Sequence, residues 1–299
     1  MKPPKSPALA KAVDHSLGLV FLLPALVVFA YFQWYPILFN FLLGFQQYTP
    51  GYDPVWSGWS NFGAVLTDPQ LPQAAWNTVV FVVLCLIIGY LVPVAAAVML
   101  GEVRRGKGFF RLAIYMPRII PGIALYIIWR WIFDPQFGLA NQVLGLVGIG
   151  PQGWLLDQNQ VMVALVIMST WANFGGTAIL YMATLTSVST ELYEAAELDG
   201  AGFWGRIRAV TLPSLSSTMK LLLILQLIGT FQVLQEPFVM TGGGPAGAST
   251  TLMYLVYNYA FVNAEFGKAG ALGTLIFLAL LILSVLYVRR SDLAVGKGV

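Results

Sequence analysis

The residues able to do acid–base, nucleophilic or metal chemistry are few and scattered in this chain. His15 is the single histidine, and Cys85 is the single cysteine, inside the apolar run FVVLCLIIGY. One cysteine excludes an intrachain disulfide and a thiolate metal cluster. A Ser-His dyad or a histidine zinc site would need His15 beside other ligands, whereas it lies at the edge of the first apolar run. We therefore expect no catalytic residues and no metal site, which argues against an intramembrane enzyme.

Arg118 is the most informative charged residue, because it lies inside a long apolar stretch, in YMPRIIPGIAL. An arginine near mid-membrane costs about 2.5–3.5 kcal/mol on insertion scales. Pro117 and Pro121 should kink the helix and free carbonyls that only protein or water can satisfy. Arg118 therefore either lines a polar pathway, or is a snorkelling anchor or an ion-pair partner of Glu236.

A later apolar stretch also carries polar side chains. These are Gln226, Gln232, Gln235 and Glu236. We expect Glu236 to lie close to the outer end of its span, exposed to headgroups. The stretch TGGGPAGAST follows, and it lacks the Gly-Lys-Ser/Thr ending of a phosphate-binding loop. We therefore interpret TGGGPAGAST as a flexible outer loop and not as a nucleotide-binding site.

The composition indicates whether the chain folds in water or in a membrane. Of 299 residues, 58% are hydrophobic and only 10% are charged, whereas soluble domains carry about 25% charged residues. These charges are too few to cover the surface of a soluble fold. The sequence predicts an all-α, integral membrane protein.

Segments of about 20 apolar residues cross the hydrocarbon core as helices. Six segments meet this criterion: 17–45, 78–101, 109–133, 161–187, 216–240 and 268–288. The first is too long for a signal peptide and has no small-residue cleavage site after it, so we interpret it as an anchor. We divide the chain into an N-terminal segment 1–16, a transmembrane domain 17–290 and a C-terminal tail 291–299.

The basic residues give the orientation. Thirteen of the sixteen Lys and Arg residues lie at the N-terminus, at the C-terminus or in the loops after spans two and four. The loops 46–77, 134–160 and 241–267 contain none. Because cytoplasmic loops carry the excess of Lys and Arg, we place both termini in the cytoplasm.

One cytoplasmic loop is unusually structured. ELYEAAELDGAGFWGRIRAVTLPSL, residues 191–215, holds four of the thirteen acidic residues between two apolar runs. It predicts a helix capped by Ser189 or Thr190, a break at Asp199-Gly200, and a second helix that Pro213 ends. The alternatives are an amphipathic connector on the membrane surface and a surface that docks on another protein.

EAAELDGAGFWGRIRAVTLP resembles the EAA loop of permease subunits of ATP-binding-cassette (ABC) importers. FLLPALVVFAYFQWYPI, NFGAVLTDP, WNTVVF, FGLANQVL and MTGGGPAGASTTLMYLVYNYAF resemble the carbohydrate-uptake branch, of the maltose and glycerol-3-phosphate types. The resemblance runs from about residue 20 to 290, and the triple glycine is typical of the first permease of a pair. It implies a fold with six transmembrane helices and a cytoplasmic coupling helix within 191–213.

The resemblance also implies the site residues. The substrate-pathway positions are Arg118, Gly122, Ser169, Ala172, Asn173, Gly176, Gly229 and Thr230. The positions that couple to an ATPase are Glu194, Ala195, Ala196, Asp199, Gly200, Phe203, Ile207 and Pro213. Several pathway positions are small, and small residues are also common helix-packing devices in membranes.

The resemblance implies an ATP-driven importer of a sugar or oligosaccharide in a bacterial or archaeal plasma membrane. Its partners would be a second permease, two ATPase subunits and an external solute-binding protein. ATP and Mg²⁺ would bind the ATPases, and this subunit would hold no cofactor. A phosphorylated polyol such as glycerol-3-phosphate is the alternative substrate. A secondary transporter is a further alternative, although neither internal repeats nor a mid-membrane coupling-ion carboxylate is visible.

We predict from the basic residues which loops are external. In a Cys85→Ala background, Ser57→Cys and Gln152→Cys should react with an impermeant thiol reagent in intact cells. Lys107→Cys and Gly202→Cys should react only after the membrane is opened. The reverse labelling pattern would contradict the orientation.

Overall fold

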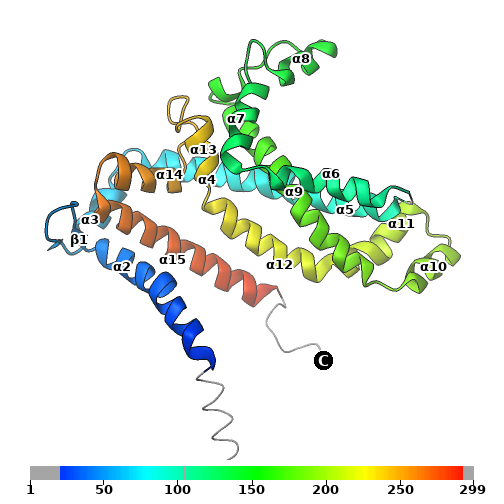
Figure 1. The fold of residues 1–299 in the computed structure, drawn as a ribbon, viewed down its shortest axis with the longest axis horizontal. Helices are drawn as coiled ribbons and strands as arrows, with labels where there is room; N and C mark the ends of the chain where they lie inside the picture. Colours follow the sequence, from blue (N-terminus) through cyan, green and yellow to red (C-terminus); the bar gives the residue numbers. More distant parts are fainter. Residues whose placement is uncertain (1–20, 104, 292–299) are drawn as a thin grey trace, which may run out of the picture. The chain divides into compact units, whose positions relative to one another are not determined.

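A computed structural model describes residues 21–103 and 105–291. The predicted segment 1–16, the first four residues of the predicted span one, Arg104 and the tail from residue 292 lie outside the described residues. The chain divides into two compact units, which are considered separately. One comprises the residues up to Val65 with Tyr259–Leu275, and the other comprises Leu66–Asn258 with the residues from Ile276. Both consist mainly of helices (Figure 1).

The smaller unit contains the first apolar helix and a short hairpin. Its elements are η1 (Ala30–Trp34), α2 (Tyr35–Leu43), β1 (Gln46–Gln47), β2 (Val55–Trp56), α3 (Ser60–Leu66), η5 (Asn258–Val262) and the start of α15 (Phe266–Arg290). The two strands pair antiparallel, with Gln46 opposite Trp56. The buried Asn61 side chain donates to the carbonyls of Gly44 (3.1 Å) and Gln46 (2.8 Å), so one amide holds the end of α2 and the start of the hairpin.

The larger unit is built around the long helix α9. Its elements are α4 (Leu71–Leu84), η2 (Cys85–Gly89), α5 (Tyr90–Glu102), α6 (Lys107–Ile119), α7 (Gly122–Ile132), α8 (Leu139–Leu146), η3 (Trp154–Leu156), α9 (Val161–Thr186), α10 (Thr190–Leu198), α11 (Phe203–Arg206), η4 (Ile207–Thr211), α12 (Leu212–Phe231), α13 (Gln235–Met240), α14 (Leu252–Tyr257) and the end of α15. Helices α4, α5, α6 and α12 all pack on α9.

The expected all-α membrane fold is confirmed. Within the described residues, five helices are long and apolar enough to cross a membrane, and the pair α6–α7 makes a sixth if it is one bent span. Two spans differ from the prediction. The predicted span 109–133 is broken between Ile119 and Gly122, where the axis bends by 98°. The predicted span 216–240 ends at Phe231, and residues 235–240 form the separate helix α13.

Proline residues explain where several α-helices contain a π-helical segment. Three of the four π-helical segments in the described chain come just before a proline: η1 before Pro36, η2 before Pro93 and η4 before Pro213. A proline cannot donate to the carbonyl four residues earlier, and its ring clashes there. The wider π turn relieves that clash without ending the helix. Pro213 therefore does not end the second helix of the 191–215 loop, contrary to our prediction, and the helix runs from Phe203 to Phe231.

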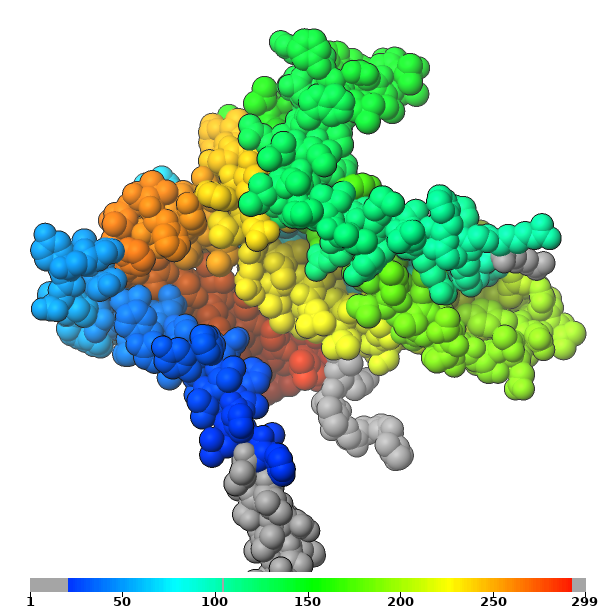
Figure 2. Space-filling model, viewed as in Figure 1, coloured from blue at the N-terminus to red at the C-terminus, as the bar shows by residue number. Residues whose placement is uncertain are grey.

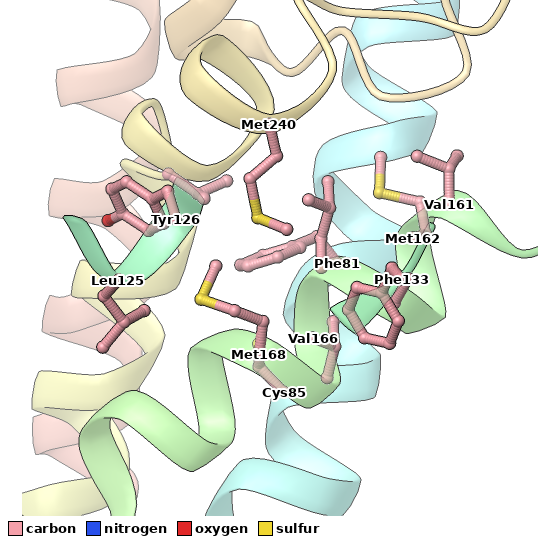
Figure 3. Close-up of a cluster of buried hydrophobic side chains, with 13 residues drawn as sticks. Phe81, Cys85, Leu125, Tyr126, Phe133, Val161, Met162, Val166, Met168 and Met240 are labelled. Carbon is pink, nitrogen blue, oxygen red and sulfur yellow. The ribbon is translucent and has the colours of Figure 1, made fainter. Parts of the chain in front are cut away.

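The main apolar core of the larger unit forms around α9, α4 and α7. Figure 3 shows Met168 and Val166 of α9 facing Phe81 of α4, with Met240 above them. Phe81 and Met168 are almost completely buried. These apolar contacts fix α9, on which the polar residues of the next section are mounted.

The crossing of α6 and α9 depends on one buried glycine. A β-carbon on Gly175 would overlap the carbonyl oxygen of Ile114 in α6. Because backbone cannot move aside as a side-chain tip can, the two helices approach closely only with glycine here. Small residues serve this purpose at helix contacts within membranes.

We predict that Gly175→Ala destabilises the protein by about 1–3 kcal/mol, as overpacked cores usually do. The matched control is Gly176→Ala, because a β-carbon on Gly176 meets nothing within 4 Å. Alanine also favours a helix over glycine by about 0.5–1 kcal/mol. Thermal unfolding in detergent should show a lower melting temperature for the first variant only, and equal melting temperatures would contradict the close approach.

Candidate functional site

A cavity of about 760 Å³ lies within the larger unit. Its walls come from α4, η2, α5, α6, α7, α9, α12 and α13. The lining residues with polar side chains are Arg118, Tyr126, Ser169, Thr170, Asn173, Thr177, Gln226, Thr230, Gln232, Gln235 and Glu236, with Cys85 beside them. Small-molecule sites in proteins commonly measure about 300–1,000 Å³. The cavity therefore has the size of a ligand site, and half of its 22 lining residues carry polar side chains.

A chain of hydrogen bonds connects Arg118 to Glu236 through α9. The Arg118 guanidinium donates to Asn173 Oδ1, and Asn173 Nδ2 donates to the Ser169 carbonyl (2.8 Å). The Ser169 hydroxyl in turn donates to Glu236 Oε1 (3.0 Å). Neither charge forms an ion pair with a described residue, so the ion-pair alternative for Arg118 is replaced by an indirect link. Two charges from α6 and α13 are held at one cavity by neighbouring turns of α9.

The position of Glu236 differs from our expectation of a headgroup-exposed residue. It lines the cavity and is only partly accessible. The reason is the early end of α12: beyond Phe231 the backbone turns, and Glu236 belongs to the first turn of α13. Its carboxylate thus points toward the polar wall formed by α9.

Breaks in the backbone border the cavity, and side chains satisfy the carbonyls that they free. Pro237 cannot donate to the Val233 carbonyl, four residues earlier, and the Thr251 hydroxyl donates to that carbonyl instead (2.8 Å). Gln226 Nε2 donates to the carbonyl of Cys85, the first residue of the π-helical η2 (2.7 Å). The irregular backbone is therefore stabilised where it faces the cavity.

The cavity brings together five of the eight predicted pathway residues: Arg118, Ser169, Asn173, Gly229 and Thr230. Gly122 lies at its edge, because a β-carbon there would be 3.9 Å from Gln235 Oε1. Ala172 instead packs on the apolar core. Gly176 does not line the cavity, and nothing in its surroundings assigns it a role.

Several lining residues were not among the predicted site residues. Tyr126 donates to Gln235 Oε1 (3.1 Å), and Gln226 Nε2 donates to the Cys85 carbonyl (2.7 Å). The buried Thr170 hydroxyl has no hydrogen-bond partner within the described residues. The glutamines and Glu236 were visible as polar residues in an apolar stretch, but their common cavity required the break after Phe231.

A second candidate site is the loop 191–215, which forms α10, α11 and η4. Ser189 caps α10 by accepting the N–H of Glu191 (3.2 Å), as predicted. Gly200 follows α10 with φ at +81°, and its N–H bonds to the Glu197 carbonyl (3.0 Å). The N–H of Ala201 bonds to the Ala196 carbonyl (2.9 Å), which completes a Schellman end. The predicted break at Asp199-Gly200 is confirmed.

Most of the loop residues predicted to contact a partner are accessible. Glu194, Ala195, Asp199 and Phe203 are exposed, and Ala196 is partly exposed. Figure 2 shows this yellow-green part at the surface of the larger unit. Pro213 is also exposed, within the continuing helix. Ile207, however, is buried inside the chain, so it anchors the loop and does not contact a partner.

An arginine holds the two halves of the loop together. Arg206 of α11 forms an ion pair with Glu197 of α10, and its other terminal nitrogen lies 4.0 Å from Glu102 at the end of α5. The Tyr193 and Thr211 hydroxyls are also hydrogen-bonded (3.3 Å). These contacts join α10 to α11 and η4 in a hairpin of helices.

We expected the TGGGPAGAST stretch to be a flexible loop, but hydrogen bonds to α4 and within the stretch hold it in place. Asn77 Nδ2 donates to the carbonyls of Gly247 (2.8 Å) and Thr250 (2.9 Å). The Thr241 and Ser249 hydroxyls also bond to each other (2.7 Å). Within residues 21–103 and 105–291, no group of His, Cys, Asp and Glu could hold a metal ion, and His15 lies outside those ranges.

Comparison with known proteins identifies the family of this chain. Residues 89–295 match the model of the binding-protein-dependent transport system inner membrane component family. The chain is 33% identical over 276 residues to a probable ABC transporter permease protein of Bacillus subtilis, covering 90% of this chain and 94% of that one. It is 33% identical to the lactose transport system permease protein of Rhizobium radiobacter, covering 90% of this chain and 92% of that one.

The fold is also similar to a solved structure. A chain of a bacterial ABC transporter involved in the import of the acidic polysaccharide alginate superposes with a TM-score of 0.82 at 22% identity, covering 97% of this chain and 100% of that one. The apolar helices, the polar cavity, the helical loop and these similarities agree. The chain belongs to the family of inner membrane components of binding-protein-dependent ABC transport systems.

Proposed function

We propose that this permease forms half of the translocation pathway of an ATP-driven importer for a neutral sugar or oligosaccharide. The observation that carries the proposal is the open cavity of about 760 Å³ that membrane helices line with polar side chains. Its substrate would arrive from an external solute-binding protein. A permease of the arabinooligosaccharide transport system of Bacillus subtilis is 30% identical over 282 residues, which supports this substrate class.

The chemistry of the cavity suits a polyhydroxyl ligand. Amide, hydroxyl and phenol groups can each donate or accept, as a sugar hydroxyl can. Tyr126, Ser169 and Thr230 bring such groups to the lining.

A phosphorylated polyol is the second candidate substrate. Arg118 lines the cavity, and the sn-glycerol-3-phosphate transport system permease of Agrobacterium fabrum is 32% identical over 247 residues. Two features of this cavity oppose an anion. The Glu236 carboxylate lines the same wall, and the Arg118 guanidinium is already hydrogen-bonded to Asn173.

The same proposal includes the partners. The subunit pairs with a second permease and two ATPase subunits in a bacterial or archaeal plasma membrane, with both termini in the cytoplasm. ATP and Mg²⁺ bind the ATPases, and the 191–213 loop docks in a groove on one of them. A docked, rigid helical hairpin loses less conformational entropy than a bare loop would. The loaded binding protein and ATP then shift the permeases between access states by binding those states with different affinity.

The test is ATP hydrolysis by the purified complex in proteoliposomes, with its binding protein. Neutral oligosaccharides should stimulate hydrolysis and enter the vesicles only with ATP, and glycerol-3-phosphate should do neither. Stimulation by phosphorylated polyols alone would favour the second candidate substrate. Uptake driven by an ion gradient without ATP would overturn the importer assignment in favour of a secondary transporter.

The same assay tests the coupling loop through two glycines. Gly200→Val places a β-branched residue at φ +81°, which such residues strongly resist. The control is Gly202→Val, because Gly202 has φ at −67° and open space around a β-carbon. We expect only the first variant to lose ATPase binding or substrate-stimulated hydrolysis while both insert in the membrane. Unchanged ATPase pull-down and stimulation in Gly200→Val would contradict the coupling role.

Arg118 should be needed for transport and dispensable for assembly. We predict that Arg118→Ala reduces uptake, because it breaks the hydrogen-bond chain to Glu236, while basal ATP hydrolysis and subunit pull-down stay near wild type. Arg130→Ala is the control, since Arg130 is exposed on α7 and does not line this cavity. Normal uptake by Arg118→Ala would make the residue a snorkelling anchor.

A further inference from the structure

A second cavity, of about 420 Å³, lies in the larger unit where α5, α6, α9 and α10 meet. It is distinct from the polar cavity, since the two share no lining residue. Two of the apolar spans end here: one runs to Glu102 and the other to Thr186. By the orientation predicted from the basic residues, these helix ends face the cytoplasm, so the cavity lies toward the cytoplasmic side of the larger unit.

One wall of this cytoplasmic-side cavity is basic. Lys107 and Arg111 line it and are one turn apart on α6. The Lys107 ammonium donates one hydrogen bond, to the Gly101 carbonyl (3.1 Å). Arg111 has no hydrogen bond or ion pair with any described residue. The one acidic residue in the lining is Glu102, whose carboxylate faces Arg206 at 4.0 Å.

The opposite wall offers hydroxyls and the start of a helix. Thr186, Thr190, Tyr193 and Thr211 line it. Thr190 is the first residue of α10, which is nine residues long. A helix start carries partial positive charge and free N–H groups, so it adds to the attraction of an anion that the two cations already provide.

The remaining lining is apolar and comes from the ends of the spans. Ala97 and Val98 belong to α5, and Met182 and Leu185 belong to α9. A soluble phosphate would leave this surface uncovered, whereas a phospholipid could place its glycerol and upper acyl carbons there. The arrangement of cations, hydroxyls and apolar side chains thus matches the polarity of a lipid headgroup region.

We propose that this cavity binds the phosphate of an anionic phospholipid, with Lys107 and Arg111 as its cationic ligands. The bound lipid would join α6 to α10, the first helix of the coupling loop. If the loop couples to an ATPase as proposed above, anionic lipid would then steady the loop and raise substrate-stimulated hydrolysis. The binding itself does not depend on that function.

The first test measures lipid retention by native mass spectrometry. The assembled complex is purified from nanodiscs of phosphatidylcholine with increasing phosphatidylglycerol. Lys107→Gln/Arg111→Gln should weaken phosphatidylglycerol retention by about 10- to 30-fold, since each cation near the surface contributes about fivefold. The control, Arg289→Gln/Arg290→Gln, removes two exposed cations at the end of α15 and should retain the lipid. Arg111→Lys should retain most of it.

Equal retention by the pair variant and wild type, or equal losses in the pair variant and the control, would overturn the site. A separate arm uses phosphatidylcholine alone and compares inorganic phosphate with chloride at equal ionic strength. A phosphate-specific rise in melting temperature that requires Lys107 and Arg111 would assign the cavity to a soluble phosphate and overturn the lipid. Retention is measured without substrate or ATP, so failure of the sugar-importer proposal would leave this result intact.

Discussion

The hydrocarbon core offers no water to backbone N–H and C=O groups, so every break in a helix must be satisfied by protein or must face a wet cavity. The larger unit obeys this constraint closely. Its breaks after Ile119 and Phe231 and its π turn at Cys85 all adjoin the polar cavity. The Gln226 and Thr251 side chains donate to the Cys85 and Val233 carbonyls at these irregular places. The cavity and the breaks therefore require each other, because a break facing lipid would be too costly.

The same constraint explains how two charges can lie in the cavity wall. An isolated charge in a membrane is expensive, and a direct ion pair between Arg118 and Glu236 would leave little for a ligand to bind. The structure spreads the compensation over Asn173 and Ser169. The guanidinium and the carboxyl group therefore both have hydrogen-bond partners within the protein.

The sequence was sufficient to predict features that depend on local chemistry. Apolar length predicted the spans, the pair Pro117 and Pro121 predicted a kink, and Asp199-Gly200 predicted the turn of the loop. It was not sufficient where tertiary contacts decide. The predicted span 216–240 ends early at Phe231, and the Val233 carbonyl beyond that end accepts a hydrogen bond from the distant Thr251. The burial of Ile207 and the inward position of Glu236 likewise depend on neighbours that no local pattern specifies.

The two candidate sites are joined by helices rather than by loops. Helix α9 carries Ser169 and Asn173 at the cavity and ends at Thr186, four residues before α10 begins. The helix from Phe203 to Phe231 has 29 residues and carries Thr230 to the same cavity. At 1.5 Å per residue it is about 43 Å long. A tilt of the hairpin formed by α10 and α11, which the Arg206–Glu197 ion pair joins, would therefore move two cavity walls together. If the loop couples to an ATPase as proposed, a ligand that favours one arrangement of those walls must also favour one orientation of the loop, because coupling is reciprocal in binding free energy.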